Sequence, residues 1–208
     1  MYDSSHPYVE LHVSPNGPSY AQPAALQIIR DHDLFNKLTD RVILVIGATS
    51  GLGVETARTL RVTSADVFIT ARDIRMAQDV IDNIKKSSQE SEKLEVIEVD
   101  MNSFDSVKKA ARAFLTKPSK LNILVNNADV QHKLNTSVYT ADTQTGIMAT
   151  PEESKISDGF EQQFGVNQLA HFTLTTLLLP TLISSSTISL NSRTIALTPN
   201  GYRYSTIN

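Results

Sequence analysis

Hydrophobic and polar positions follow two alternating patterns along most of the chain. Short runs of aliphatic and β-branched residues, typical of strands buried on both faces, alternate with longer stretches whose apolar residues recur every three or four positions. The short runs predict strands at residues 41–46, 65–70, 93–100, 121–126 and 192–198. The longer stretches predict helices at 54–62, 73–88, 103–117 and 158–183, after a short helical lead-in at 25–40.

This alternation of strands and helices predicts an α/β fold. Buried strands joined by helices pair in parallel with right-handed crossovers, and the helices then cover both faces of the sheet. We therefore expect a Rossmann-like, doubly wound parallel sheet in three αβα layers. Ligands of such sheets bind at the carboxyl ends of the strands, near the point where the strand order reverses.

Two segments depart from the pattern. Residues 1–23 contain four prolines among Ser, Asn and Tyr, which predicts a flexible arm ahead of a domain at 24–208. Residues 129–145 are polar and rich in Thr, directly after a buried strand. A structureless stretch of that length is uncommon inside a compact domain, so it indicates a functional loop, a disordered segment or a misread element.

Composition narrows the class of protein. The chain has 208 residues, of which 40% are hydrophobic and 20% charged, enough for one domain with a sizeable core. A net charge of -3 without a basic block argues against nucleic acid and favours a small-molecule partner. Without cysteine, and with histidines that lack paired ligand spacing, we expect no metal site. No signal pattern or membrane-spanning apolar run occurs, which predicts a cytoplasmic protein.

The strongest chemical signal is the stretch VIGATSGLG, residues 45–53. Gly47, Gly51 and Gly53 stand where the first predicted strand meets the first helix. Glycines there permit a tight turn, close approach of the backbone to a pyrophosphate and tight helix packing, while helix N–H groups face the phosphates. The alternative is a glycine-rich turn that binds no ligand.

The glycine stretch and three further motifs make the sequence resemble the short-chain dehydrogenase/reductase family over residues 41–208. The resemblance rests on the Gly-x-x-x-Gly-x-Gly spacing, Val99 and Asp100 after the third strand, Asn126-Asn127-Ala128 after the fourth, and VNQLAHF, which contains Asn167. The phrases GIM, DGFE, FGVN and AHF are most similar to the retinol-dehydrogenase-like and WW-domain-oxidoreductase-like branch. The resemblance implies an oxidoreductase that acts on a carbonyl or alcohol with a nicotinamide cofactor.

The resemblance also implies a set of cofactor-binding residues. These are Gly47, Thr49, Ser50, Gly51, Leu52, Gly53, Arg72, Asp100, Met101, Asn126, Asn127 and Ala128. At the end of the second strand an acidic side chain would bind the ribose 2′-hydroxyl, whereas a basic one would pair with a 2′-phosphate. Arg72 stands there, so NADP(H) is favoured over NAD(H), with a merely solvated Arg72 as the alternative. Neighbouring Asp73 is a candidate cap for the next helix.

The catalytic set of the family is incomplete in this sequence. The family uses a Tyr as general acid/base, a Lys that lowers its pKa, a Ser that orients the substrate and an Asn that holds a relay water. Asn167 is the member present, Pro199 stands at the Ser position, and the 208 residues contain no Tyr-x-x-x-Lys. Thr198 is a poor substitute, because adjacent strand residues point in opposite directions.

We therefore expect an incomplete domain that lacks the family's C-terminal strands. The strand at 192–198 would then be an uncovered apolar edge. The helix that completes the family's dimer interface would be missing too, which leaves homo-oligomerisation open.

The family motif Asn-Asn-Ala-Gly-Ile-Met is interrupted here. The seventeen residues 129–145 separate Ala128 from Gly146. They are either retained intron sequence translated in frame or a loop over the nicotinamide pocket. Two functions follow for the chain: an NADP(H)-dependent oxidoreductase, or a non-catalytic remnant that binds a dinucleotide or a partner.

A smaller departure concerns the end of the first helix. Ser64 stands where the family has a Gly in the left-handed conformation. A serine there costs about 1 kcal/mol. We expect local strain in a fold that still forms.

Overall fold

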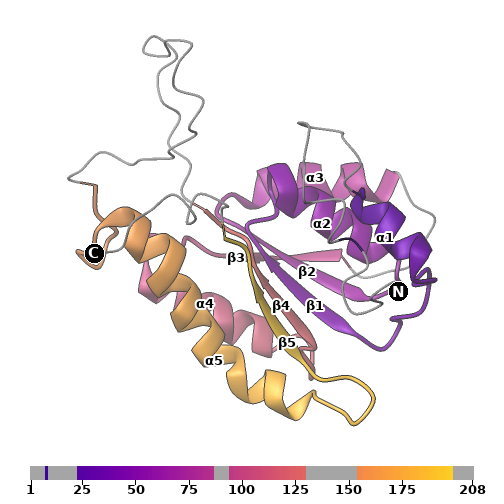
Figure 1. The fold of residues 1–208 in the computed structure, drawn as a ribbon. Coiled ribbons are helices and arrows are strands. Elements are labelled where there is room, and N and C mark those ends of the chain that lie inside the picture. The colour runs from indigo at the N-terminus through magenta and orange to yellow at the C-terminus, as the bar shows by residue number, and fades with distance from the viewer. Residues whose placement is uncertain (1–7, 9–22, 87–93, 130–153, 199–208) are drawn as a thin grey trace.

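The computed structural model describes residue 8 and residues 23–86, 94–129 and 154–198, and it shows a parallel sheet between two helical layers (Figure 1). The strands are β1 (Val42–Ile46), β2 (Asp66–Ala71), β3 (Leu94–Glu98), β4 (Ile123–Asn126) and β5 (Arg193–Ala196). The helices are α1 (Ala25–Asp31), α2 (Gly51–Arg61), α3 (Ile74–Lys86), α4 (Phe104–Leu115) and α5 (His171–Ser184), the last continuing the π-helix η3 (Phe164–Ala170). The order β3-β2-β1-β4-β5 confirms the doubly wound, Rossmann-like fold.

Strand β1 lies at the centre because its side chains are apolar on both faces. All five of its residues are buried. Leu44 and Ile46 belong to the core under α4 and α5, whereas Ile43 and Val45 belong to the core under α2 and α3. These two cores are the reason for three layers, since each face of β1 needs a helical cover.

A buried asparagine joins the amino ends of the two central strands. Asn122 is fully buried, and its Oδ1 accepts a hydrogen bond from the Val42 amide at 3.0 Å. Its Nδ2 donates to the Ser185 carbonyl at 3.2 Å, just beyond the end of α5. Both ends of this side-chain amide are thus satisfied, so Asn122 fixes β4 against β1 and α5 at the edge of the sheet opposite the strands' carboxyl ends.

The helix predicted at 158–183 starts later than expected. Residues Lys155 and Glu161 instead form an antiparallel bridge around a turn in which Gly159 has a φ of 86°. Asp and Gly favour such turns over a helix start, which periodicity alone does not reveal. The Asp158 carboxylate accepts a hydrogen bond from the Phe104 amide at 2.9 Å, so this turn packs against the first residue of α4.

Other predicted boundaries differ from the structure by up to nine residues, and the largest difference is at the end of the lead-in helix predicted at 25–40. The lead-in helix ends at Asp31, because Asp33 and Asn36 adopt positive φ angles. Helix α2 begins at Gly51, three residues before the predicted start. Ser103 caps α4 by accepting a hydrogen bond from the Ser106 amide.

Strand β5 is at one edge of the sheet that the structure describes. Its four residues are all exposed within the described part of the chain, and Ile195 has 45% of its surface accessible. Strand β5 pairs with β4 on its other side. None of the described helices is both long and apolar enough to cross a membrane.

Several predictions concern residues outside the described ranges. They are the arm at 1–23 apart from Tyr8 and Pro23, the insert at 129–145 apart from Asp129, and the positions Gly146 and Pro199. Tyr8 itself donates a hydrogen bond to the Asp31 carboxylate at the end of α1, at 3.0 Å. The division into an arm and a domain, and both interpretations of the insert, stay predictions.

Ser64 provides a test of backbone strain. It has a φ of 63°, as expected for a position where the family has Gly, and its hydroxyl donates to Asn36 Oδ1 at 2.6 Å. Ser64→Gly removes the left-handed penalty and an exposed hydrogen bond, and we expect it to raise the free energy of unfolding by about 0.5–1 kcal/mol. Ser64→Ala keeps the strain but loses the hydrogen bond, so it should lower stability. Urea unfolding that ranks the Gly variant below the Ala variant would contradict this account.

Candidate functional site

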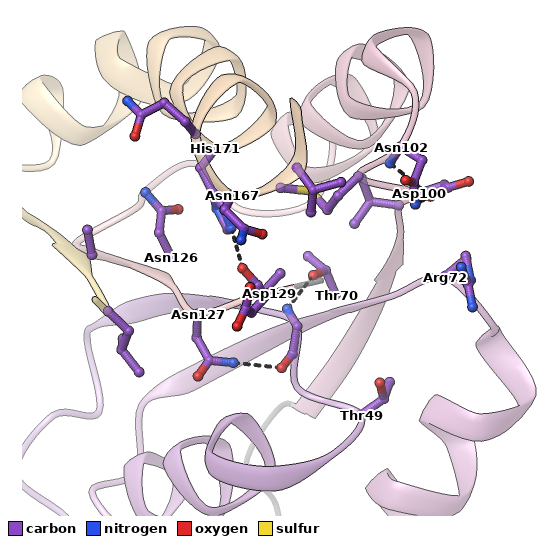
Figure 2. Close-up of a pocket in the computed structure, with 18 of the residues that line it drawn as sticks. Thr49, Thr70, Arg72, Asp100, Asn102, Asn126, Asn127, Asp129, Asn167 and His171 are labelled. Carbon is purple, nitrogen blue, oxygen red and sulfur yellow. Dashed lines mark hydrogen bonds between the residues drawn. The ribbon is translucent and has the colours of Figure 1, made fainter. Parts of the chain in front are cut away.

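An open cleft of about 1540 Å³ lies at the carboxyl ends of the strands. Figure 2 shows 18 of the residues that line it. The cleft includes the ends of β1 and β4, the two neighbouring strands at which the strand order reverses. The sequence-predicted residues that line it are Gly47, Thr49, Ser50, Gly51, Leu52, Arg72, Asp100, Met101, Asn126, Asn127, Ala128 and Asn167. Gly53 lies behind the turn, in the first helical turn of α2. Their roles toward a ligand remain predictions.

The glycine turn between β1 and α2 needs its glycines for close packing and for backbone conformation. A Cβ on Gly53 would lie 2.2 Å from the Gly47 carbonyl oxygen, and a Cβ on Gly47 would lie 2.6 Å from Ala128 Cα. Gly51 has open space around it but a φ of 55°. Gly53 therefore serves packing, Gly47, with a φ of 76°, serves both packing and backbone conformation, and Gly51 serves conformation and leaves the surface free for a ligand.

Side chains at the ends of β4 and β2, the two strands that flank β1, hold this turn. Asn127 Nδ2 donates to the carbonyl oxygens of Gly47, at 2.8 Å, and Ile46, at 3.2 Å. From the other side, the Gly47 amide donates to Thr70 Oγ1 at 3.0 Å. At the start of α2, Ser50 makes no side-chain capping bond, so amide groups of the first turn remain for an anionic ligand.

The β3 end of the cleft is ordered by Asp100. Its Oδ1 accepts hydrogen bonds from the Asn102 amide, at 3.0 Å, and from Asn102 Nδ2, at 3.1 Å. Its own amide donates to Ser106 Oγ on α4. Asn102 in turn accepts a hydrogen bond from Gln162 Nε2 at 2.9 Å, which ties this wall to the residues leading into η3.

The β2 end of the cleft has an exposed cation. Arg72 is exposed and lines the cleft, and Figure 2 shows it apart from Asn126, Asn127, Asn167 and His171. The neighbouring Asp73 carboxylate accepts a hydrogen bond from the Arg75 amide at 2.8 Å, in the first turn of α3. Asp73 is thus a helix cap, as the sequence suggested.

The opposite end of the cleft is bounded by η3 and α5. Asn167 lies within the π-helix, a rare element that often occurs at functional sites. His171 Nε2 lies 2.8 Å from the Ala128 carbonyl oxygen, and Thr175 Oγ1 accepts a hydrogen bond from Asn126 Nδ2 at 3.1 Å. Sequence reasoning missed His171 and Thr175, although they follow Asn167 at successive intervals of four residues, which puts the three on one helical face.

His171 is a buried, neutral imidazole. It is 7% exposed, and burial lowers its pKa below the ordinary 6.5, although the Ala128 carbonyl and the charge of Asp129 act in the opposite direction. Since a carbonyl oxygen only accepts, Nε2 carries the proton and donates to Ala128. Nδ1 then has a lone pair, and it has no hydrogen-bond partner among the described residues.

Thr198 lines the cleft. Its direction relative to the position of the family's Ser stays a prediction, which rests on the alternation of side chains along a strand. Strand β5 ends at Ala196, so that alternation does not extend to Thr198. Pro199 lies outside the described residues.

Comparisons with known proteins agree with this geometry. The sequence profile of the short chain dehydrogenase family matches residues 41–192. Short-chain dehydrogenase/reductase prx1 of Penicillium roqueforti is 37% identical over 200 residues, which are 96% of this chain and 52% of that protein. Retinol dehydrogenase 12 of Mus musculus is 36% identical over 150 residues, 72% of this chain and 42% of that protein.

A solved structure shares the fold. The Pseudomonas aeruginosa RhlG/NADP active-site complex superposes with a TM-score of 0.57 and 24% identity, over 77% of this chain and 55% of that one. The chain belongs to the short-chain dehydrogenase/reductase family. Within it, the retinol dehydrogenase match places the chain in the retinol-dehydrogenase-like branch. The chain spans about half the length of the relatives it matches.

Alanine substitutions at two glycines distinguish packing from backbone strain. In Gly53→Ala the new Cβ meets backbone oxygen at 2.2 Å, so we expect a loss of about 3 kcal/mol in the free energy of unfolding. Gly51→Ala meets no atom and should cost only the left-handed penalty, about 1 kcal/mol. Urea unfolding of both variants measures the difference, and equal losses would show that the close approach at Gly53 is relieved at little cost.

Proposed function

We propose that this chain binds NADP(H) and forms the dinucleotide-binding part of a short-chain oxidoreductase that acts on a carbonyl or alcohol. The observation that carries this proposal is the glycine turn at the uncapped start of α2, which opens on the same cleft as Arg72 and Asn167. The cofactor would supply hydride transfer when bound.

The residues of the cleft fit the parts of a dinucleotide. Amide groups at the start of α2 would bind the pyrophosphate, and Gly51 leaves space for its approach. Arg72 would pair with the 2′-phosphate of NADP(H), while Asp73 is engaged as a helix cap. By family resemblance, Asp100 would meet the adenine, and Asn167 would hold a relay water at the nicotinamide end.

A lipophilic substrate is the class we favour. The related mouse protein is named a retinol dehydrogenase. In this chain Phe172 and Leu197 line the cleft and are 64% and 43% exposed, respectively. Apolar side chains so exposed beside Asn167 fit a substrate with a hydrocarbon portion.

A non-catalytic, dinucleotide-binding role is the second candidate. Pro199 has neither a donor nor an acceptor in its side chain, and no Tyr-x-x-x-Lys occurs in the 208 residues. Thr198, which precedes Pro199 in the sequence and carries a hydroxyl group, lines the cleft. The glycine turn does not depend on any of these residues, so binding and catalysis are separable in this chain.

Replacing Arg72 tests the choice of cofactor. Arg72→Gln removes the guanidinium, and we expect the dissociation constant for NADPH to rise about 10–100-fold while that for NADH changes little. Fluorescence titration with both dinucleotides measures this. Arg58→Gln is the matched control, because Arg58 lies on α2, where it pairs with Glu55. Parallel weakening of NADPH and NADH would contradict the assignment of Arg72 to the 2′-phosphate.

A turnover assay tests whether the 208-residue chain is catalytic by itself. The 208-residue chain, saturated with NADPH and given a panel of lipophilic aldehydes and ketones, should bind the cofactor without oxidising it, because the family's Ser, Tyr and Lys are not in place. The absorbance of NADPH follows the reaction. Steady oxidation would establish catalysis by this chain, and Thr198→Val would then show whether that hydroxyl replaces the family's Ser.

A further inference from the structure

We infer that His171 is a positioning residue that sets the spacing between the helix bearing Asn167 and the glycine turn. This inference rests on the proposed dinucleotide function, because the two elements it joins are the opposite ends of that site. No role for His171 follows from the glycine motif or from the family's catalytic set.

A continuous series of contacts leads from His171 to the glycine turn. The imidazole Nε2 donates to the Ala128 carbonyl at 2.8 Å, across 43 residues of sequence. A Cβ on Gly47 would lie 2.6 Å from Ala128 Cα, so Ala128 packs directly on Gly47. The adjacent Asn127 holds the Gly47 carbonyl at 2.8 Å. Any shift of Ala128 relative to α5 therefore moves the backbone expected to face the pyrophosphate.

The same helical face makes a second bond to β4. Thr175, one turn after His171, accepts a hydrogen bond from Asn126 Nδ2. The two bonds attach α5 to residues on either side of Asn127. Asn167 precedes His171 by four residues, so the ring is one helical turn away from the predicted catalytic side chain.

Packing alone does not explain an imidazole at this position. The ring is buried, and its Nδ1 has no partner among the described residues, so an apolar side chain of similar size would avoid an unsatisfied acceptor. The ring is neutral because burial lowers its pKa, and Asp129 is the charged residue whose field acts on it. What the imidazole adds is one N–H donor directed at Ala128, which is the function we assign to it.

Three variants of the 208-residue chain test this inference. His171→Gln keeps an N–H donor near the position of Nε2, His171→Leu fills the space without a donor, and His171→Asn has a donor on a shorter side chain. We expect the Leu and Asn variants to bind NADPH about tenfold more weakly than wild type, and the Gln variant to bind within about threefold, by fluorescence titration. Circular dichroism establishes that each variant is folded.

Amide NMR spectra of the protein without cofactor give a second readout. The resonances of Gly47 and Asn127 should move in the Leu and Asn variants and stay near their wild-type positions in the Gln variant. Equal NADPH affinity in all folded variants, or unmoved Gly47 and Asn127 resonances in the Leu and Asn variants, would overturn the inference. If His171→Leu does not fold, the Asn and Gln variants decide. Absence of NADPH binding by wild type would refute the proposed function, and the resonances would still decide the role of His171.

Discussion

The close approach between the β1–α2 turn and the end of β4 is the constraint on which the rest of this structure depends. A methyl group on Gly47 would lie 2.6 Å from Ala128 Cα, and one on Gly53 would lie 2.7 Å from Asn127 Nδ2. Asn127 satisfies two carbonyl groups in the same place. Because β1 and β4 are neighbours in the sheet, this contact brings the start of α2 to the cleft between them and leaves its amide groups facing outward.

How much of the fold and of the cleft could be predicted depends on whether the sequence carries a local signal for each feature. The buried runs are strong signals for parallel strands, so β1 to β4 were expected almost at their observed limits, and the glycine spacing identified the cleft. Asn122 and His171 are single polar residues within apolar stretches, and their partners are 80 and 43 residues away. Neither periodicity nor local propensity encodes such pairings. The late start of the Asn167 helix had a local signal, Asp158–Gly159, that periodicity overrode.

The electrostatics at the β2 end show how a local bond can decide a ligand preference. Arg72 and Asp73 are adjacent, and either could face a ribose in principle. The first turn of α3 has unsatisfied amides, and the Asp73 carboxylate accepts from them. A carboxylate already bound there offers less to a ribose hydroxyl, whereas the exposed guanidinium keeps its donors. The proposal that Arg72 pairs with a 2′-phosphate thus rests on the helix-capping role of Asp73 as well as on the charge of Arg72.

Helix α5 combines two requirements that fix the width of the cleft. Leu174, Leu178 and Leu182 pack into the core under β1 and β4, which sets the distance of the helix from the sheet. His171 and Thr175 bond to residues at the end of β4. Apolar packing along three turns resists sliding of the helix only weakly, because leucines are interchangeable along it, whereas hydrogen bonds to named atoms define a register. The core therefore holds α5 at the sheet, and the polar face determines where along the sheet Asn167 stands.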